Sequence, residues 1–272
     1  GYELSYDDLS AQSLTQMTMS GGVIPVGNYL YDGYQMTNAV YASMETQLPS
    51  DITLTYGARY TWVHTDMDMT RIKGSNQITD GSTSDGKLIF NAGLMWRASD
   101  NLSLRASYAQ GYRAPILQEL YDTAMGQNSG YTYANPDLKP ETSDNFEIGA
   151  RWALAYVSAD VAAFYSEADD YITTLRVSDS EYRYSNVAEA KTFGIELTSS
   201  VRIAETGFEP YVTATWMRRQ FQNGDGFSTY DTATPEFMLR YGVRWSGMYA
   251  GVGLRTDVFA RSQSEIEYDD GV

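Results

Sequence analysis

Apolar and polar side chains alternate along most of this chain with a period of two. Between Ile52 and Trp62, the even positions are apolar or aromatic, whereas the odd positions carry Thr, Gly or Arg. Successive side chains of a β-strand point to opposite faces of the sheet, so this alternation predicts strands with one apolar and one polar face. The same pattern returns in five other segments, which are 88–96, 102–108, 146–154, 193–198 and 250–255.

The complete pattern predicts eleven strands, which cover 1–9, 35–48, 51–66, 87–98, 101–112, 142–154, 156–177, 181–203, 208–222, 235–246 and 248–262. Short turns are expected at 49–50, at 99–100, near Ala155, at 204–207 and at Gly247. Longer loops are expected at the other connections, over 10–34, 67–86, 113–141 and 223–234, with a tighter turn near 178–180. Short turns at one end of the strands and long loops at the other are typical of an outer-membrane β-barrel, in which about ten tilted residues cross the hydrocarbon.

A soluble β-sandwich is the alternative, because its strands also alternate. Soluble strands often have only about five or six residues, fewer than the strands predicted here. Charged side chains lie mid-strand on the polar face, which suits a water-filled lumen: Arg59, Arg97, Arg105, Glu147, Arg151 and Glu196. Aromatic residues gather near strand ends, like the girdles at membrane interfaces, in pairs such as Tyr60/Trp62, Tyr108/Tyr112, Trp152/Tyr156 and Trp245/Tyr249. We therefore predict an all-β fold, an antiparallel transmembrane β-barrel.

Composition narrows the classes of function. The chain has 272 residues with 19 basic and 35 acidic side chains, and its net charge of −16 argues against a nucleic-acid-binding protein. Cysteine is absent and His64 is the one histidine, which removes thiolate and multi-histidine metal sites. No apolar run of roughly 18 residues predicts a transmembrane helix. No nucleophile–base pair or phosphate-binding loop is present, so we predict no enzyme, no cofactor and no metal site.

Eleven strands do not complete a barrel. Bacterial single-chain barrels have even numbers of strands, and an open edge in lipid leaves backbone groups unpaired at a cost of several kcal/mol each. The simplest interpretation is that residues 1–272 form one segment of a larger barrel.

The loop over 113–141 is the most informative connection. Loops of this length are uncommon within one compact domain and are usually functional or disordered. Pro115, Pro136 and Pro140 fix φ and lack N–H donors, so they stop strand pairing at both ends of the loop. The rigid guanidinium of Arg113 is suited to clamp a carboxylate at the loop base. Its candidate partners are Glu119, Asp137 and Glu141.

Tyrosine side chains supply most of the candidate ligand contacts in this loop. The predicted ligand-binding set is Tyr112, Arg113, Tyr121, Tyr131 and Tyr133. Tyrosine offers a flat, rigid surface with a polar tip, which suits an aromatic ligand. Two alternatives stay open at this point, an interfacial aromatic belt and packing of the loop against itself.

Two short sequence boxes flank the loop. The first reads Tyr-Ala-Gln-Gly-Tyr-Arg-Ala-Pro over 108–115, with Arg113, Ala114 and Pro115 at its end. The second reads Asn-Pro-Asp-Leu-Lys-Pro-Glu-Thr-Ser over 135–143, beginning with Asn135, Pro136, Asp137 and Leu138. In this order and spacing they resemble the two boxes of the TonB-dependent outer-membrane receptors. Weaker matches extend the resemblance over most of the chain, at 56–60, 186–187, 194–197 and Pro235.

The resemblance implies a barrel of about 22 strands with a plugged lumen, of which this chain would be the middle and later part, without plug domain or C-terminal strand. It implies an active importer of a scarce nutrient, energised by the TonB complex and surrounded by outer-membrane lipid. The expected ligand is a ferric siderophore. Haem-uptake members typically carry a histidine between the boxes, and residues 116–134 contain none, which puts haem in doubt. A passive porin-like barrel and a surface adhesin or phage attachment barrel are the alternatives.

Overall fold

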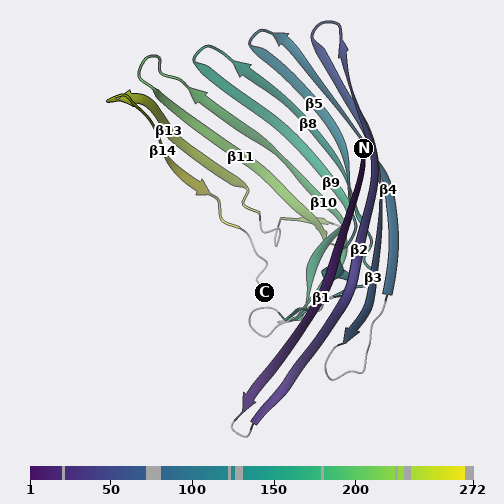
Figure 1. Ribbon diagram of the computed structural model, residues 1–272. Helices are drawn as coiled ribbons and strands as arrows, with labels where there is room; N and C mark the ends of the chain where they lie inside the picture. The colour runs from purple at the N-terminus through teal and green to yellow at the C-terminus, as the bar shows by residue number, and fades with distance from the viewer. Residues whose placement is uncertain are drawn as a thin grey trace.

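The computed structural model describes residues 1–19, 22–71, 81–121, 124–125, 131–178, 181–223, 226–229 and 234–266. Eleven long strands follow one another in chain order in one sheet, and each pairs antiparallel with the next (Figure 1). These strands are β1 (Tyr2–Met19), β2 (Gly22–Leu48), β3 (Ile52–Arg71), β4 (Gly81–Ser99), β5 (Leu102–Arg113), β8 (Glu141–Ala153), β9 (Val157–Ser178), β10 (Glu181–Val201), β11 (Phe208–Asn223), β13 (Phe237–Tyr249) and β14 (Val252–Gln263). Four short elements lie in the connections: α1 (Leu117–Tyr121), β6 (Ala124–Met125), β7 (Tyr131–Tyr133) and β12 (Gly226–Ser228).

The two faces of the sheet differ as the alternation predicts. One face, the apolar face, exposes large side chains such as Tyr56 and Tyr60 on β3. The other face, the polar face, carries ion pairs between strands. Arg59 contacts Glu3 at 2.9 Å, and Arg105 contacts both Glu147 at 2.8 Å and Asp160 at 2.9 Å. The predicted eleven-stranded antiparallel all-β fold is confirmed.

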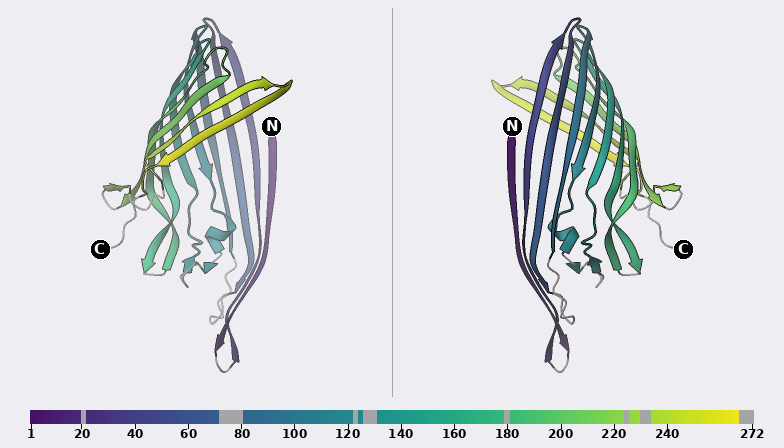
Figure 2. Two further views of the ribbon diagram at one scale, coloured as in Figure 1. Left: turned by 90° about the vertical axis from the view of Figure 1, so that its left-hand side faces the viewer. Right: turned by 90° about the vertical axis from the view of Figure 1, so that its right-hand side faces the viewer.

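The sheet is curved and open, with β1 and β14 as its edges (Figures 1 and 2). Short turns lie together at one end, which is the upper end in Figure 1, and the longer connections lie at the other. The turn between β13 and β14 consists of Ala250 and Gly251, whose φ angles are 50° and 81°. Two successive residues with positive φ match the right-handed twist of the flanking strands, as in a type I′ hairpin.

The loop predicted over 10–34 is wrong. β1 continues to Met19 and β2 begins at Gly22, with backbone pairing from Ser10 opposite Asp32 to Met19 opposite Gly22. This hairpin projects past the other strands at the lower end of Figure 1. Backbone pairing does not require apolar and polar side chains to alternate. The sequence over 10–34 lacks this alternation, so the pattern does not predict the hairpin.

Four other connections also differ from the prediction. The loop over 67–86 is shorter, because β3 runs to Arg71 and Gly81 already pairs with Met67. The predicted loops over 113–141 and 223–234 contain α1, β6, β7 and β12. The turn predicted at Gly247 is wrong, since Gly247 still pairs with Leu254 and the chain reverses three residues later.

No helix among the described residues is long and apolar enough to cross a membrane.

A small apolar cluster, here called the loop core, lies at the end of the sheet where the long connections are. It consists of Met67, Leu117, Leu120, Tyr121, Leu138 and Ile172, each at most 8 % exposed. Leu9 and Tyr184 pack against it. The loop core joins α1 and the second box to β3 and β9, so it holds the loop against the sheet.

Candidate functional site

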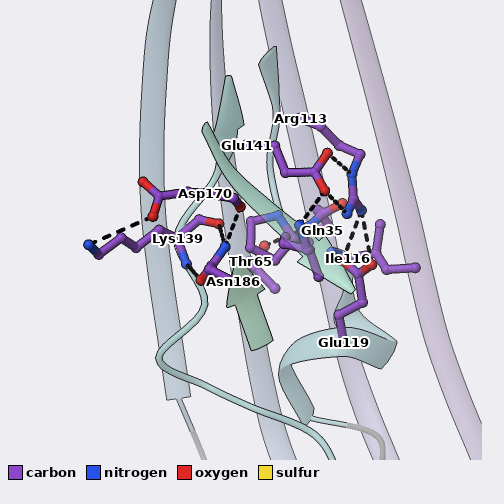
Figure 3. A network of polar contacts seen from close by, with 11 residues as sticks. Gln35, Thr65, Arg113, Ile116, Glu119, Lys139, Glu141, Asp170 and Asn186 are labelled. Atoms are coloured by element: carbon purple, nitrogen blue, oxygen red, sulfur yellow. Dashed lines mark hydrogen bonds and ion pairs between the residues drawn. The ribbon is translucent and has the colours of Figure 1, made fainter. Parts of the chain in front are cut away.

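The two boxes meet at the base of the loop. Arg113 ends β5 and Glu141 begins β8, and the two residues are opposite each other in the strand register. Arg113 Nε and Nη2 donate to the two carboxylate oxygens of Glu141, each at 2.8 Å (Figure 3). This fork-to-fork geometry adds directional specificity to the attraction between the charges.

Glu119 completes the group of three residues that we call the Arg113 triad. Arg113 Nη1 lies 3.0 and 2.9 Å from its two oxygens. Glu119 is the third residue of α1, and its carboxylate also accepts the N–H of Ile116 at 3.0 Å. A glutamate at this position commonly reaches back to the residue before the first helical turn, which leaves fewer N–H groups unpaired. The triad therefore links strand pairing at the loop base to the start of α1.

The triad is largely withdrawn from water. The side chains of Glu119 and Glu141 are 11 % and 14 % exposed, and that of Arg113 is 39 % exposed. Glu141 also accepts the N–H of Ile172 on β9 at 2.6 Å. Nε, Nη1 and Nη2 of Arg113 therefore all donate to carboxylates of the protein itself. Glu119 and Glu141 are two of the three predicted partners, and the third, Asp137, makes no described contact with Arg113.

The second box is held through amide side chains. Asn135 Oδ1 accepts the N–H of Asp137 at 3.1 Å, and Asn135 Nδ2 donates to the carbonyl of Tyr184 at 2.9 Å. Asn186 of β10 accepts the Lys139 N–H at 2.9 Å and donates to the Lys139 carbonyl at 3.0 Å (Figure 3). In this way the Asn186 side chain takes the place of a neighbouring strand for Lys139.

The first box is also tied to the sheet on the side of β2 and β3. Gln35 Nε2 donates to the carbonyl of Pro115 at 2.9 Å and to Thr65 Oγ1 at 2.8 Å. Pro115 is buried, and Thr65 is 2 % exposed beneath the loop. Sequence reasoning missed the roles of Gln35 and Asn186, because the contacts of Gln35 with Pro115 and of Asn186 with Lys139 join residues 80 and 47 positions apart.

Three of the predicted ligand-binding tyrosines, Tyr112, Tyr121 and Tyr133, have described side chains, and each has different surroundings. Tyr121 is 4 % exposed in the loop core, where burial and then the charge of Asp66 raise the pKa of its phenol. Tyr112 donates its hydroxyl to Asp85 at 3.1 Å. Tyr133 is 36 % exposed and donates to Glu181 at 2.9 Å. Tyr131 lies in β7, where its backbone pairs with Glu181 of β10, and its side chain lies outside the described residues. Ligand contact by this set stays a prediction.

His64, the single histidine, lies on the apolar face, away from the triad. Its Nδ1 is 2.8 Å from Ser84 Oγ, and its ring stacks on Trp62 with 5.8 Å between ring centroids. Within the described residues, no group of three or more His, Cys, Asp or Glu side chains has a metal-binding arrangement.

Known proteins with similar sequences share this architecture. The family described as TonB dependent receptor-like, beta-barrel matches residues 1–271. The Vitamin B12 transporter BtuB of Vibrio vulnificus (strain YJ016) is 31 % identical over 172 residues, which cover 62 % of this chain and 26 % of that transporter. The Rhizobactin receptor of Rhizobium meliloti (strain 1021) is 25 % identical over 211 residues, which cover 70 % of this chain and 28 % of that receptor. The chain spans about a quarter of the length of these curated relatives.

Solved structures share the fold. The ferric yersiniabactin uptake receptor FyuA from Yersinia pestis is similar over 96 % of this chain and 39 % of FyuA, with a TM-score of 0.70 and 18 % identity. The copper transporter OprC is similar over 91 % of this chain and 38 % of its own, with a TM-score of 0.73 and 14 % identity. The chain therefore belongs to the TonB-dependent receptor-like β-barrel family, and its location is the bacterial outer membrane.

Proposed function

We propose that this chain is part of the barrel wall of an active importer, which binds a scarce nutrient at its outer loops and is energised by TonB. The nutrient in this proposal is a ferric siderophore, and TonB acts through a plug domain of the full-length receptor. The polar face of the sheet lines the lumen, and the apolar face contacts outer-membrane lipid.

The names of the relatives support import but differ in ligand. They include a vitamin B12 transporter, a Rhizobactin receptor and a Hemin receptor. Structural neighbours include the ferric yersiniabactin uptake receptor FyuA and the ferric-catecholate import receptor Fiu. The absence of histidine between Pro115 and Asn135 favours a siderophore over haem. A passive porin-like barrel and an adhesin receive no support from these relatives.

The Arg113 triad is the observation that carries the proposal. It anchors the loop over 113–141 on the polar face, at the end of the sheet where the long connections lie. A loop held at both ends offers an importer a fixed surface on which a ligand can bind before energy is supplied.

We assign different roles to the candidate ligand residues within this proposal. Arg113 and Tyr121 position the loop, since the first is saturated by carboxylates and the second is buried. Tyr112, Tyr131 and Tyr133 are left as the candidates for ligand contact. Aromatic residues with a polar tip give contact area at a low cost in conformational entropy.

Growth of a deletion strain tests the function. The strain carries the full-length gene and is supplied with ferric siderophores, haem or cobalamin, in the presence and in the absence of functional TonB. We expect growth on at least one ferric siderophore, and only with TonB. Uptake that persists without TonB, together with leakage of small sugars from liposomes that contain the receptor, would establish the porin-like alternative.

A further inference from the structure

A pocket of about 320 Å³ opens on the polar face beside Arg113. Its wall is formed by β5, β8, β9, β10 and β11, so five neighbouring strands contribute to it. The charged lining residues are Arg113, Glu141 and Arg219. Arg113 and Glu141 pair with each other, which leaves Arg219 as the charge to be explained.

Arg219 lies against aromatic rings. Its Nη2 donates to the hydroxyl of Tyr171 at 2.6 Å. Its guanidinium carbon is 5.1 Å from the ring centroid of Tyr171 and 5.5 Å from that of Phe221, and the two rings stack on each other. These contacts fix the position of the guanidinium, because a cation is attracted to the face of an aromatic ring.

The charge of Arg219 has no counter-charge in the described part of the chain. Its Nε is buried without a hydrogen-bond partner, and no described carboxylate forms an ion pair with it. Arg105, Arg113, Arg218 and Arg244 each contact at least one carboxylate. Nε of Arg240 is buried without a partner as well, but Arg240 contacts Asp257 at 3.3 Å, whereas no described carboxylate neutralises the charge of Arg219 on the polar face.

Hydroxyl groups surround the same pocket. Thr192 is directly opposite Arg219 in the strand register, and Ser166 is directly opposite Thr192. Ser143 also lines the pocket; its Oγ accepts from Asn145 Nδ2 at 3.0 Å, and Ser166 Oγ donates to Asn145 Oδ1 at 2.7 Å, which leaves the Ser143 hydroxyl able to donate and that of Ser166 able to accept. One guanidinium without a described carboxylate partner, several hydroxyls and an aromatic wall form a suitable environment for an anionic oxygen group on an aromatic or small organic molecule.

We propose that this pocket, with Arg219 as its charged anchor, is a subsite for an anionic oxygen group of the imported ligand, either a carboxylate or a phenolate. The inference rests on the importer function proposed above and adds a substrate class, namely ligands that carry a negative charge on such a group. Arg219 supplies the counter-charge, Tyr171 holds the guanidinium in place, and the hydroxyls accept or donate the remaining hydrogen bonds.

Arg218 provides a matched control within the same strand. It is adjacent to Arg219 but points to the apolar face, where its side chain is 48 % exposed and contacts Glu236 at 2.8 Å. Replacing either arginine by glutamine removes one positive charge from β11. Only the change at Arg219 removes it from the pocket.

The test is a ligand-observed NMR titration of the purified full-length receptor with salicylate, which is anionic, and with salicylamide, its neutral analogue. We expect the wild-type receptor to bind salicylate more tightly than salicylamide. Arg219→Gln should weaken salicylate binding at least about tenfold, which corresponds to about 1.4 kcal/mol, and leave salicylamide unchanged, because only the anion loses a charge-assisted hydrogen bond. Arg218→Gln should change neither affinity.

A second variant keeps the test decisive if Arg219→Gln does not fold. Thr192→Glu places a carboxylate opposite Arg219 and retains the arginine, so it should also abolish the preference for salicylate. Equal salicylate affinity in wild type and Arg219→Gln would overturn the subsite. A second pair of results would also overturn it: the wild-type receptor does not bind salicylate, and Arg219→Gln lowers the melting temperature of the receptor. Arg219 would then pair with a carboxylate elsewhere in the receptor.

The binding readout separates this proposal from the importer function. A receptor that prefers salicylate through Arg219, yet supports no TonB-dependent growth, keeps the subsite and refutes the importer. A receptor that supports such growth but shows no effect of Arg219→Gln keeps the importer and refutes the subsite.

Discussion

Arg113 and Glu141 form the last cross-strand pair of β5 and β8 before the chain leaves the sheet, and two hydrogen bonds of 2.8 Å join their side chains. The same guanidinium reaches Glu119 in α1. One side chain therefore couples strand pairing to the fold of the loop. Breaking it should loosen the loop without unfolding the strands below.

Arg113→Ala should increase how often the loop over 113–141 opens away from the sheet. The change leaves Glu119 and Glu141, which are 11 % and 14 % exposed, without their counter-charge. Loss of a buried partner costs about 3–5 kcal/mol, and the partial exposure of Arg113 reduces this to about 1–3 kcal/mol of local stability. Hydrogen–deuterium exchange of the full-length receptor should show faster exchange over 114–121 and 135–140.

Arg151→Ala is the control for this prediction. Arg151 projects from β8 on the same polar face but is exposed and makes no described ion pair. Arg151→Ala should leave hydrogen–deuterium exchange in the loop unchanged. If Arg113→Ala reduces ligand uptake while exchange in the loop stays at the wild-type rate, Arg113 acts by contact with the ligand and its positioning role is wrong.

Leu120→Ala should release α1 from the sheet. Leu120 is 1 % exposed in the loop core, and removing three carbon atoms from a buried leucine costs about 2–5 kcal/mol. A five-residue helix is not stable alone, so the loss should appear as faster exchange over 116–121 and easier proteolysis there. Gln118→Ala, on the exposed side of the same helix, should have no such effect. Equal protection of both variants would show that the triad alone holds the loop.

The strands could be predicted from the sequence because their two faces meet different surroundings. Ile52–Trp62 alternates since one face of β3 is apolar and the other carries Arg59 and Thr61. The sequence over 10–34 does not alternate in this way, so the pattern does not predict its hairpin. Alternation reports the surroundings of side chains, whereas strand pairing itself is a backbone property.

The site was predictable only in part for a related reason. The fork of Arg113 suggested a carboxylate partner, and the structure has two, Glu119 and Glu141. The helix α1 has five residues, too few to show a 3.6-residue period, and its stability comes from Glu119 and from packing on Met67. The burial of Tyr121 depends on those same long-range contacts, so the sequence did not distinguish a ligand contact from a packing residue.

Asn186→Ala should loosen the attachment of the second box to β10. Asn186 accepts one hydrogen bond from Lys139, donates one to it, and donates another to the carbonyl of Asp170 at 2.5 Å. Each net hydrogen bond contributes about 0.5–1.5 kcal/mol, so the loss of all three should cost about 1.5–4.5 kcal/mol. Exchange of the Lys139 amide should accelerate. Asn186→Asp keeps the acceptor oxygen and loses both N–H donors, so the Lys139 amide should exchange at a rate between those of wild type and Asn186→Ala. A rate equal to that of wild type would show that the two donated hydrogen bonds contribute nothing.

Gly194→Ala should destabilise the barrel wall. Gly194 is buried between β9 and β11, and a Cβ there would lie 2.9 Å from Met217 Cα and 2.9 Å from Phe164 Cζ, and closer still to the carbonyl oxygen of Trp216. The backbone of β11 cannot move aside without disturbing its pairing with β10, where Gly194 is directly opposite Met217. Overpacking of this kind costs about 1–3 kcal/mol.

The melting of the full-length receptor in outer membranes, followed by its heat-dependent mobility on gels, measures this cost. Gly194→Ala should melt several degrees below wild type, since about 1 kcal/mol shifts the midpoint by a few degrees in a protein of a few hundred residues. Gly253→Ala is the control, because its Cβ would meet only Met248 Sδ at 3.7 Å. Equal melting of the two variants would mean that β9, β10 and β11 yield to a methyl group, and that Gly194 is not required for their close packing.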